Sequence, residues 1–112
     1  MYYSQIFAAA ANAVLIVSAA GVIERANRAA CELTGYSQAE MLGQSLALLS
    51  DSYTLDDLAA WRALAPGEIW RTERLDRRKG GSAYFDEMVV TAVYAADGAI
   101  TLYVVIKQDI SE

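Results

Sequence analysis

Four residues in the second half of the chain place an aromatic ring and polar groups at a spacing of two. Trp70, Thr72, Arg74 and Asp76 lie in a segment with the period of a β-strand. Successive strand side chains point to opposite faces, so these four share one face. A stacking ring and hydrogen-bonding groups on one face can converge on a planar ligand. The alternative is that Trp70 is a core residue and Asp76 pairs with Arg74 or Arg78 near the surface.

The sequence offers no recognisable set of catalytic residues. The sequence contains no histidine, which removes the commonest general base and metal ligand. Cys31 is the only cysteine, so it has neither a disulfide partner nor a ligand-spaced one. Asp86 and Glu87 are strand neighbours that point to opposite faces, so they cannot share one substrate. We expect no enzymatic activity and neither a catalytic residue nor a metal site.

Size and charge restrict the class of protein further. A chain of 112 residues that is 55% hydrophobic suits one domain with one core. Its net charge is −5, and its largest basic cluster is Arg77-Arg78-Lys79, which argues against nucleic-acid binding. No apolar run approaches the ~20 residues that span a bilayer, so we expect no membrane insertion by this segment. The lone cysteine fits a reducing, cytoplasmic location.

Turn and capping residues predict the elements that would position these side chains. Residues 13–17 and 22–25 read as two strands joined by a turn at Gly21. Asn27 is expected to cap a helix through Leu33 that ends at Gly35. Two further helices are expected, as follows. One begins at the capping box Ser37 to Glu40 and ends at Gly43. The other begins at Thr54, with Asp57 completing its cap, and ends at Pro66-Gly67. Its expected apolar stripe consists of Leu55, Leu58, Trp61 and Leu64.

From Glu68 the hydrophobic period becomes two, with turns at 77–81 and 95–98. Three strands in a meander then complete a five-stranded antiparallel sheet with short helices packed on one face, an α+β fold. Residues 1–11 are alanine-rich with Ile6 and Phe7 at helical spacing, so an amphipathic helix is expected ahead of a domain over 12–112. The final strand runs to the end of the sequence, as expected of a piece of a longer protein.

This ordered set of motifs resembles the PAS sensor family. The resemblance rests on five segments: Asn27-Arg28-Ala29-Ala30, residues 34–43 (TGYSQAEMLG), residues 67–71 (GEIWR), residues 77–82 (RRKGGS) and the closing Asp109-Ile110-Ser111. The departures are Arg28 in place of the usual proline, Ala30 in place of an aromatic residue and Ala20 in place of an acidic one.

The resemblance implies a module for signal transduction. Members sense light, oxygen, redox state, a metabolite or a partner protein, and they pass the signal to a kinase of a two-component system, a diguanylate cyclase or a transcription regulator, commonly in bacteria. The resemblance thus implies a C-terminal effector domain outside this sequence. In the family, Asp109, Ile110 and Ser111 correspond to the relay towards that effector, although a frayed chain end is the alternative. The apolar face of the helix over 1–11 predicts a homodimer.

The resemblance also limits the possible cofactors. Light-sensing members need a thiol where this sequence has Leu46, which argues against a covalent photoactive flavin. The absence of histidine argues against His-ligated haem and leaves only an unusual Met, Cys or Tyr ligand for iron. Members that bind FAD non-covalently carry two tryptophans, matched by Trp61 and Trp70, but Asp76 stands where they have an asparagine. FAD thus stays possible, as does a ligand-free dimerisation module. Any small-molecule ligand is expected between the sheet and the helices over 27–49, where Asn27 is a further candidate contact.

Overall fold

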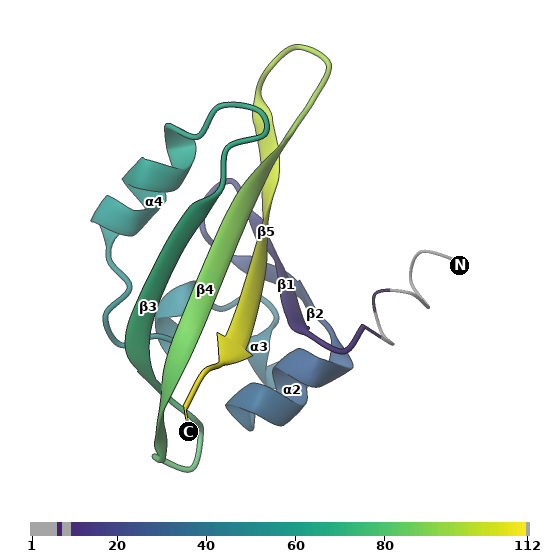
Figure 1. The fold of residues 1–112 in the computed structure, drawn as a ribbon. Coiled ribbons are helices and arrows are strands. Elements are labelled where there is room, and N and C mark those ends of the chain that lie inside the picture. The colour runs from purple at the N-terminus through teal and green to yellow at the C-terminus, as the bar shows by residue number, and fades with distance from the viewer. Residues whose placement is uncertain (1–6, 8–9, 112) are drawn as a thin grey trace.

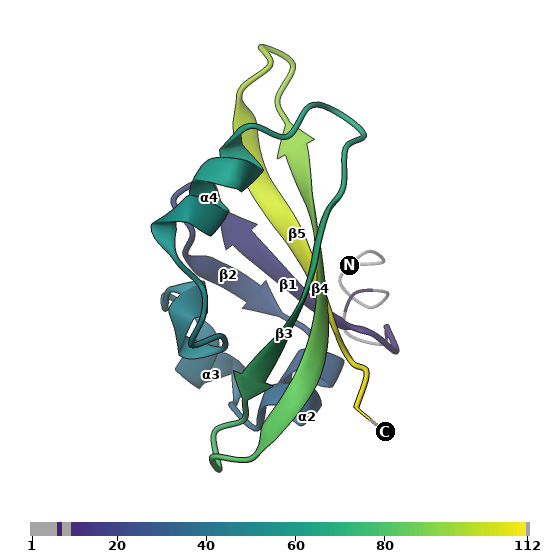
Figure 2. The ribbon, with the colours of Figure 1, turned by 60° about the vertical axis from the view of Figure 1, so that its left-hand side comes forward.

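The computed structural model describes residue 7 and residues 10–111, and it contains one antiparallel sheet with helices on one face (Figures 1 and 2). The strands are β1 (Ala13–Ser18), β2 (Ile23–Ala26), β3 (Trp70–Arg77), β4 (Ala83–Tyr94) and β5 (Ile100–Asp109), in the spatial order β2-β1-β5-β4-β3. The helices are α2 (Arg28–Thr34), α3 (Gln38–Met41), the 3₁₀ helix η1 (Leu46–Leu48) and α4 (Leu55–Arg62). The predicted α+β fold is confirmed, whereas most of the helix predicted over 1–11 lies outside the described residues.

The middle of the sheet is β5, the last strand in sequence. It pairs with β1 from Ala13↔Lys107 to Ser18↔Leu102, and with β4 from Asp86↔Asp109 to Tyr94↔Ile100. Figure 1 shows β5 running down between its two neighbours to the C-terminal end. Residues near the end of β5 therefore lie between side chains of β1 on one side and β4 on the other.

Asn27 fixes the junction between β1, β2 and α2. Its Oδ1 accepts hydrogen bonds from the backbone N–H of Ala30 and of Val14, each at 2.9 Å, and its Nδ2 donates to the carbonyl of Asn12 at 2.8 Å. Gly35 ends the helix with φ 79°, a conformation that glycine adopts without strain. Both predicted boundaries of this helix are confirmed, and Asn27 uses its side chain for structure.

The two later helices confirm the predicted N-termini but not every detail of their faces. Ser37 and Glu40 exchange the two hydrogen bonds of a capping box, at 3.1 and 2.9 Å. Helix α4 ends at Arg62, before the predicted stop at 66–67, and Leu55 is 80% exposed. The predicted stripe is wrong at Leu55 because each step of three residues rotates about 60° around a helix, so a face centred on Trp61 turns Leu55 outward.

Replacing Asn27 with alanine should lower the free energy of unfolding by about 1–3 kcal/mol, because two backbone N–H groups lose their acceptor. Urea denaturation measures the change. Asn12→Ala is the matched control, because only the backbone carbonyl of Asn12 takes part in the contact. Equal stability of the two variants would contradict this role for the Asn27 side chain.

Candidate functional site

The four residues predicted to share a face of β3 do so, but they are spread along the strand. Trp70, Thr72 and Arg74 are half-buried on the helix-covered face and Asp76 is buried there, while the residues between them are exposed. Asp76 is six residues further along the strand than Trp70, which corresponds to about 20 Å. One planar ring therefore cannot stack on Trp70 and also reach Asp76. The face instead contains an aromatic region and a charged region.

The aromatic region is centred on Trp61 of α4, which is completely buried. Its ring centroid lies 5.7 Å from that of Trp70, 5.4 Å from that of Tyr103 and 5.6 Å from that of Tyr53, all in edge-on or tilted arrangements. Aromatic rings favour such geometries in protein cores. Trp61 and Trp70 therefore pack against each other, as in the core alternative.

Arg74 connects the two regions to α4. Its guanidinium donates two hydrogen bonds to the Asp57 carboxylate, at 3.0 and 3.2 Å, and lies 5.6 Å from the centre of the Trp70 ring. Burial acts to raise the pKa of Asp57, but the hydrogen bonds from Arg74 and from the Thr54 backbone outweigh it, so the pKa is lowered. The Arg74–Asp57 ion pair holds α4 against the sheet, and Arg74 is therefore already paired and not available to a ligand.

The expectation that Asp76 pairs with Arg74 or Arg78 near the surface is wrong. Asp76 is buried, and its carboxylate accepts a hydrogen bond from Ser50 Oγ at 2.7 Å and one from Lys107 Nζ at 2.9 Å. Lys107 also donates to Asp86, at 2.5 Å, and all three charged side chains have no exposed surface. We call Asp76, Asp86 and Lys107 the buried ionic triad.

The sequence analysis missed two members of this triad. The residues from Leu102 to Ile106 are apolar or aromatic on both faces of β5, so alternation there does not say which face is buried. The available signal was the opposite charge of Lys107 and the two aspartates on strands expected to be neighbours. Using it requires the register that places Lys107 opposite Met88, which the sequence does not supply.

The space between sheet and helices is filled by the chain's own side chains. Residues from every layer have no accessible surface, which means that no water-sized space borders them: Leu15, Val17, Ala30, Met41, Leu46, Trp61, Met88, Val90, Tyr103 and Val105. Arg74 is already paired with Asp57, and Asp76 with Lys107. Over the described residues, the inner face of the sheet therefore contains no slot for a flavin ring. The described residues therefore do not fit FAD in this arrangement.

Two open hollows lie elsewhere on the described surface. One, of about 370 Å³, lies beside α2 and the end of β5 and includes Glu32, Arg78 and Asp109; the other, of about 310 Å³, includes Arg25 and Cys31. Neither is lined by Trp70. In the described part of the chain, no three His, Cys, Asp or Glu residues gather closely enough to hold a metal ion.

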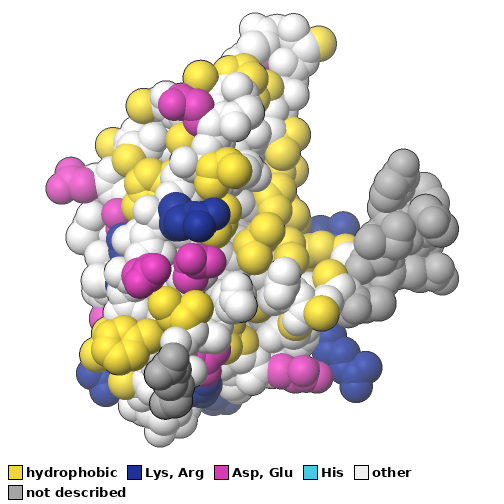
Figure 3. All heavy atoms as spheres, in the orientation of Figure 1, with side chains coloured by type: hydrophobic (Ala, Val, Ile, Leu, Met, Phe, Trp, Pro, Cys, Tyr) yellow, Lys and Arg dark blue, Asp and Glu magenta, His cyan; other side chains and the backbone are white. Residues whose placement is uncertain are grey.

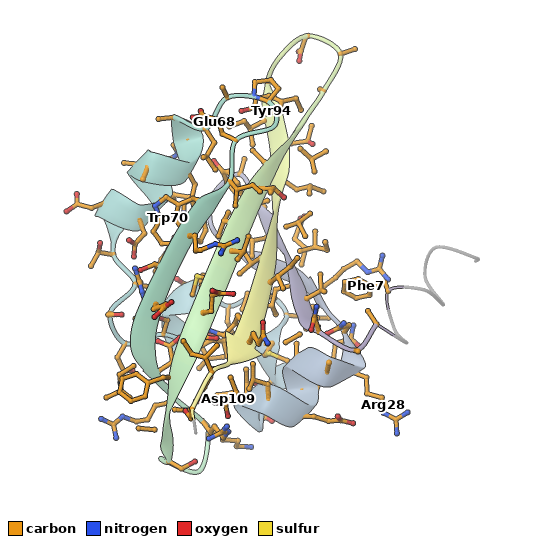
Figure 4. All side chains as sticks on the ribbon, viewed as in Figure 1. Phe7, Arg28, Glu68, Trp70, Tyr94 and Asp109 are labelled. Carbon is orange, nitrogen blue, oxygen red and sulfur yellow. The ribbon has the colours of Figure 1, made fainter. Side chains whose placement is uncertain are left out.

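The predicted relay residues are held at the opposite end of the sheet from Trp70 (Figure 4). The Asp109 carboxylate accepts a hydrogen bond from Arg78 at 2.6 Å, and Ser111 Oγ accepts one from the backbone N–H of Phe85 at 2.8 Å. The Ile110 N–H donates to the carbonyl of Phe85. Hydrogen bonds from Ser111, followed by Arg78, lower the pKa of Asp109.

Arg78 makes three contacts that bring this end of the molecule together. Besides Asp109, its Nε donates to the carbonyl of Leu33 in α2 at 3.0 Å, and its guanidinium lies 4.4 Å from the centre of the Tyr84 ring. Arg78 thus connects the β3–β4 turn, α2 and the end of β5.

A family model described as PAS fold matches residues 2–110. The chain belongs to the PAS family. Among curated proteins, this PAS domain is 32% identical over 104 residues to a nitrogen fixation regulatory protein of Klebsiella oxytoca, covering 91% of this chain and 21% of that one. It is 28% identical over 83 residues to a bacterioopsin transcriptional activator of Halobacterium salinarum, covering 72% of this chain and 12% of that one. The PAS domain thus spans about a fifth or less of these relatives.

Solved structures share the fold. The PAS domain of an HTR-like protein from Haloarcula marismortui has a TM-score of 0.83 at 21% identity, covering 97% of this chain and 89% of that one. A domain of a sensory box sensor histidine kinase/response regulator from Geobacter sulfurreducens has a TM-score of 0.77 at 26% identity, covering 96% and 91% of the two chains. Among the described residues, none of the helices has the length and apolar character needed to cross a bilayer.

Removing the ammonium group by Lys107→Met should lower the free energy of unfolding by about 3–5 kcal/mol at neutral pH, because two buried carboxyl groups lose the one cation that the described residues provide for them. Chemical denaturation followed by circular dichroism measures it. Lys79→Met is the control, since Lys79 pairs with Glu40 at an exposed site, where about 1 kcal/mol or less is expected. Similar losses in both variants would contradict the importance of the triad.

Proposed function

We propose that this PAS domain is the signal-input module of a longer regulatory protein and passes a conformational signal to an effector attached after β5. Supporting this, the similar proteins include a nitrogen fixation regulatory protein, a transcriptional activator and a sensor histidine kinase/response regulator, and the domain spans a small part of the first two. The effector would be a kinase, a diguanylate cyclase or a transcription regulator. Under this proposal the domain itself is not an enzyme and works in the cytoplasm.

The observation that carries this proposal is the set of contacts made by Arg78. Asp109 ends β5, so it stands directly before whatever follows the domain in a longer chain. Because Arg78 binds Asp109, α2 and the Tyr84 ring together, a change in helix packing or sheet twist would alter the position of Asp109. Asp109, Ile110 and Ser111 are therefore the proposed relay.

The packing favours a module whose input is a partner or a small perturbation over one that houses a large cofactor. The aromatic rings of Trp61, Trp70 and Tyr103 occupy one half of the inner face and the buried ionic triad occupies the other. A small-molecule ligand would have to displace one of these groups. This supports the ligand-free alternative over non-covalent FAD binding.

We infer in addition that the domain forms a homodimer, with residues 1–11 and the outer sheet face at the interface. The outer face of β1, β5 and β4 carries apolar side chains, namely Val14, Ile16, Val89, Val93, Leu102, Val104 and Ile106. Figure 3 views this side and shows hydrophobic side chains gathered over β4 and β5, with charged groups towards β3. An apolar sheet face of this kind is a surface that a second copy can cover.

In the full-length protein, Asp109→Ala should change effector activity or its response to the signal while leaving the domain folded, because the ion pair with Arg78 is partly exposed. An assay of effector output combined with thermal denaturation measures both. Asp51→Ala removes an exposed ion pair with Arg77 and is the matched control. Unchanged output in the Asp109 variant would show that this residue is no relay.

Light scattering should give the mass of a dimer for the intact chain, and a lower mass for a chain lacking residues 1–10 or carrying Val104→Arg, since each change removes apolar contact area. Leu55→Arg is the control, because Leu55 is 80% exposed on α4, which packs against the other face of the sheet. A monomeric intact chain would refute the proposed dimer.

A further inference from the structure

The buried ionic triad is unbalanced in charge. It holds two carboxyl groups and one ammonium group, and the side chains of Asp76, Asp86 and Lys107 have 0% exposed surface. If both aspartates were ionised, the interior would carry one uncompensated negative charge. Moving such a charge out of water is strongly unfavourable, and a buried acid then takes up a proton instead.

Neighbouring groups do not supply the missing positive charge. Arg74 of β3 lies opposite Asp86, but its guanidinium is occupied by Asp57 of α4. Ser50, from the loop before α4, brings a neutral hydroxyl to Asp76. The side facing α4 therefore adds no net charge.

The groups on the other side are balanced in the same way. Arg78 is paired with Asp109 at the end of β5, so the two charges cancel. Tyr84 of β4 is buried, and burial raises the pKa of its hydroxyl further above the ordinary tyrosine value, so the hydroxyl is neutral. The triad thus needs one proton to be neutral.

We propose that Asp76 and Asp86 form a proton-binding site in which Asp86 carries the shared proton, and that release of this proton is transmitted to the C-terminal end of β5. This inference deepens the proposed function by naming a proton as an input. It concerns the domain alone, so it can fail while the proposed relay to an effector survives.

The two carboxyl groups differ in their second hydrogen-bond donor, and this difference favours Asp86 as the one that holds the proton. Both carboxyl groups accept a hydrogen bond from Lys107. Asp76 accepts a second one from Ser50 Oγ at 2.7 Å, whereas the second one to Asp86, from the Gln108 backbone N–H, is longer at 3.2 Å. Burial, followed by the hydrogen bond with Asp76, raises the pKa of Asp86 to about 7, although Lys107 opposes this. For Asp76, burial acts to raise the pKa, but the hydrogen bond from Asp86 and the charge of Lys107 outweigh it and lower the pKa.

A hydrogen bond connects this site to the chain end. The backbone N–H of Gln108 donates to Asp86 Oδ1 at 3.2 Å, and Gln108 directly precedes the relay residue Asp109. Asp86 and Asp109 are also opposite each other in the β4–β5 ladder. Ionisation of Asp86 places a second negative charge beside Asp76. Residues 108–109 of β5 contact both Asp86 and Arg78, so we expect this segment to shift when Asp86 loses its proton.

The sign of the effect on stability follows from the raised pKa. In the unfolded chain Asp86 would lose its proton near its ordinary value of 3.8, whereas in the folded domain it keeps it to about 7. The favourable contribution is therefore fully present below 3.8 and is lost as pH rises through about 7. Asp57, Asp76 and Asp109 have lowered pKa values and act oppositely, but only at acidic pH.

The test is an NMR titration of the aspartate carboxyl carbons and the backbone amides in the intact chain. We expect one aspartate to titrate near neutral pH, the Gln108 amide to shift with the same midpoint, and both effects to vanish in Asp86→Asn. The amide of asparagine mimics the protonated acid. Glu87→Gln is the matched control: Glu87 follows Asp86 in β4 but pairs with Arg71 on the outer face, so both effects should persist.

Thermal denaturation provides a second readout. The wild-type melting temperature should fall by roughly 5–10 °C between about pH 5 and pH 8, while that of Asp86→Asn stays nearly constant. If Asp86→Asn does not fold, the wild-type titration decides alone. The proposal is overturned if every aspartate titrates below about pH 5, or if the Gln108 amide does not follow the carboxyl group.

Discussion

The ammonium group of Lys107, held between the buried carboxyl groups of Asp76 and Asp86, is the interaction on which the end of the sheet near Asp109 depends. It joins the three neighbouring strands β3, β4 and β5, and through Ser50 it also holds the loop that leads into α4. Breaking a buried ion pair by removing one partner costs much more than losing an exposed pair, because a charge is left without compensation. The triad therefore restricts how β5 can lie against its neighbours.

This restriction explains why the inner face of the sheet and the C-terminal end form one unit. Lys107 and Gln108 contact the triad, and the next residue, Asp109, contacts Arg78. The residues that contact the triad are thus only one or two positions before the proposed relay residue Asp109 in the sequence, so a change in the triad directly affects the backbone next to it. The aromatic region around Trp61 supports the other half of the face and, with Arg74 and Asp57, fixes α4 to the sheet.

The sequence predicted the fold well because its boundaries depend on local chemistry. Asn27, Gly35 and the Ser37–Glu40 capping box act within a few residues of themselves, and the structure shows each in its expected place. The face shared by Trp70 and Asp76 was also predictable, because alternation is a property of any strand. The predicted partner of Asp76 was wrong, because Lys107 lies 31 residues away in the sequence. The contact depends on how β3 pairs with β4 and how β4 pairs with β5, which local patterns do not specify. The exposure of Leu55 failed for a related reason: which part of a short helix faces the sheet is decided by packing.

The central claim is that this PAS domain closes its interior with its own aromatic rings and a buried ionic triad, without needing a large ligand. A native mass spectrum of protein purified without unfolding tests this most directly. The account predicts masses equal to the polypeptide or to whole multiples of it, with no visible absorption by the same sample. A stoichiometric added mass of a flavin or another large ligand, lost when Trp70 is replaced by alanine but retained when the exposed Arg77 is, would contradict it.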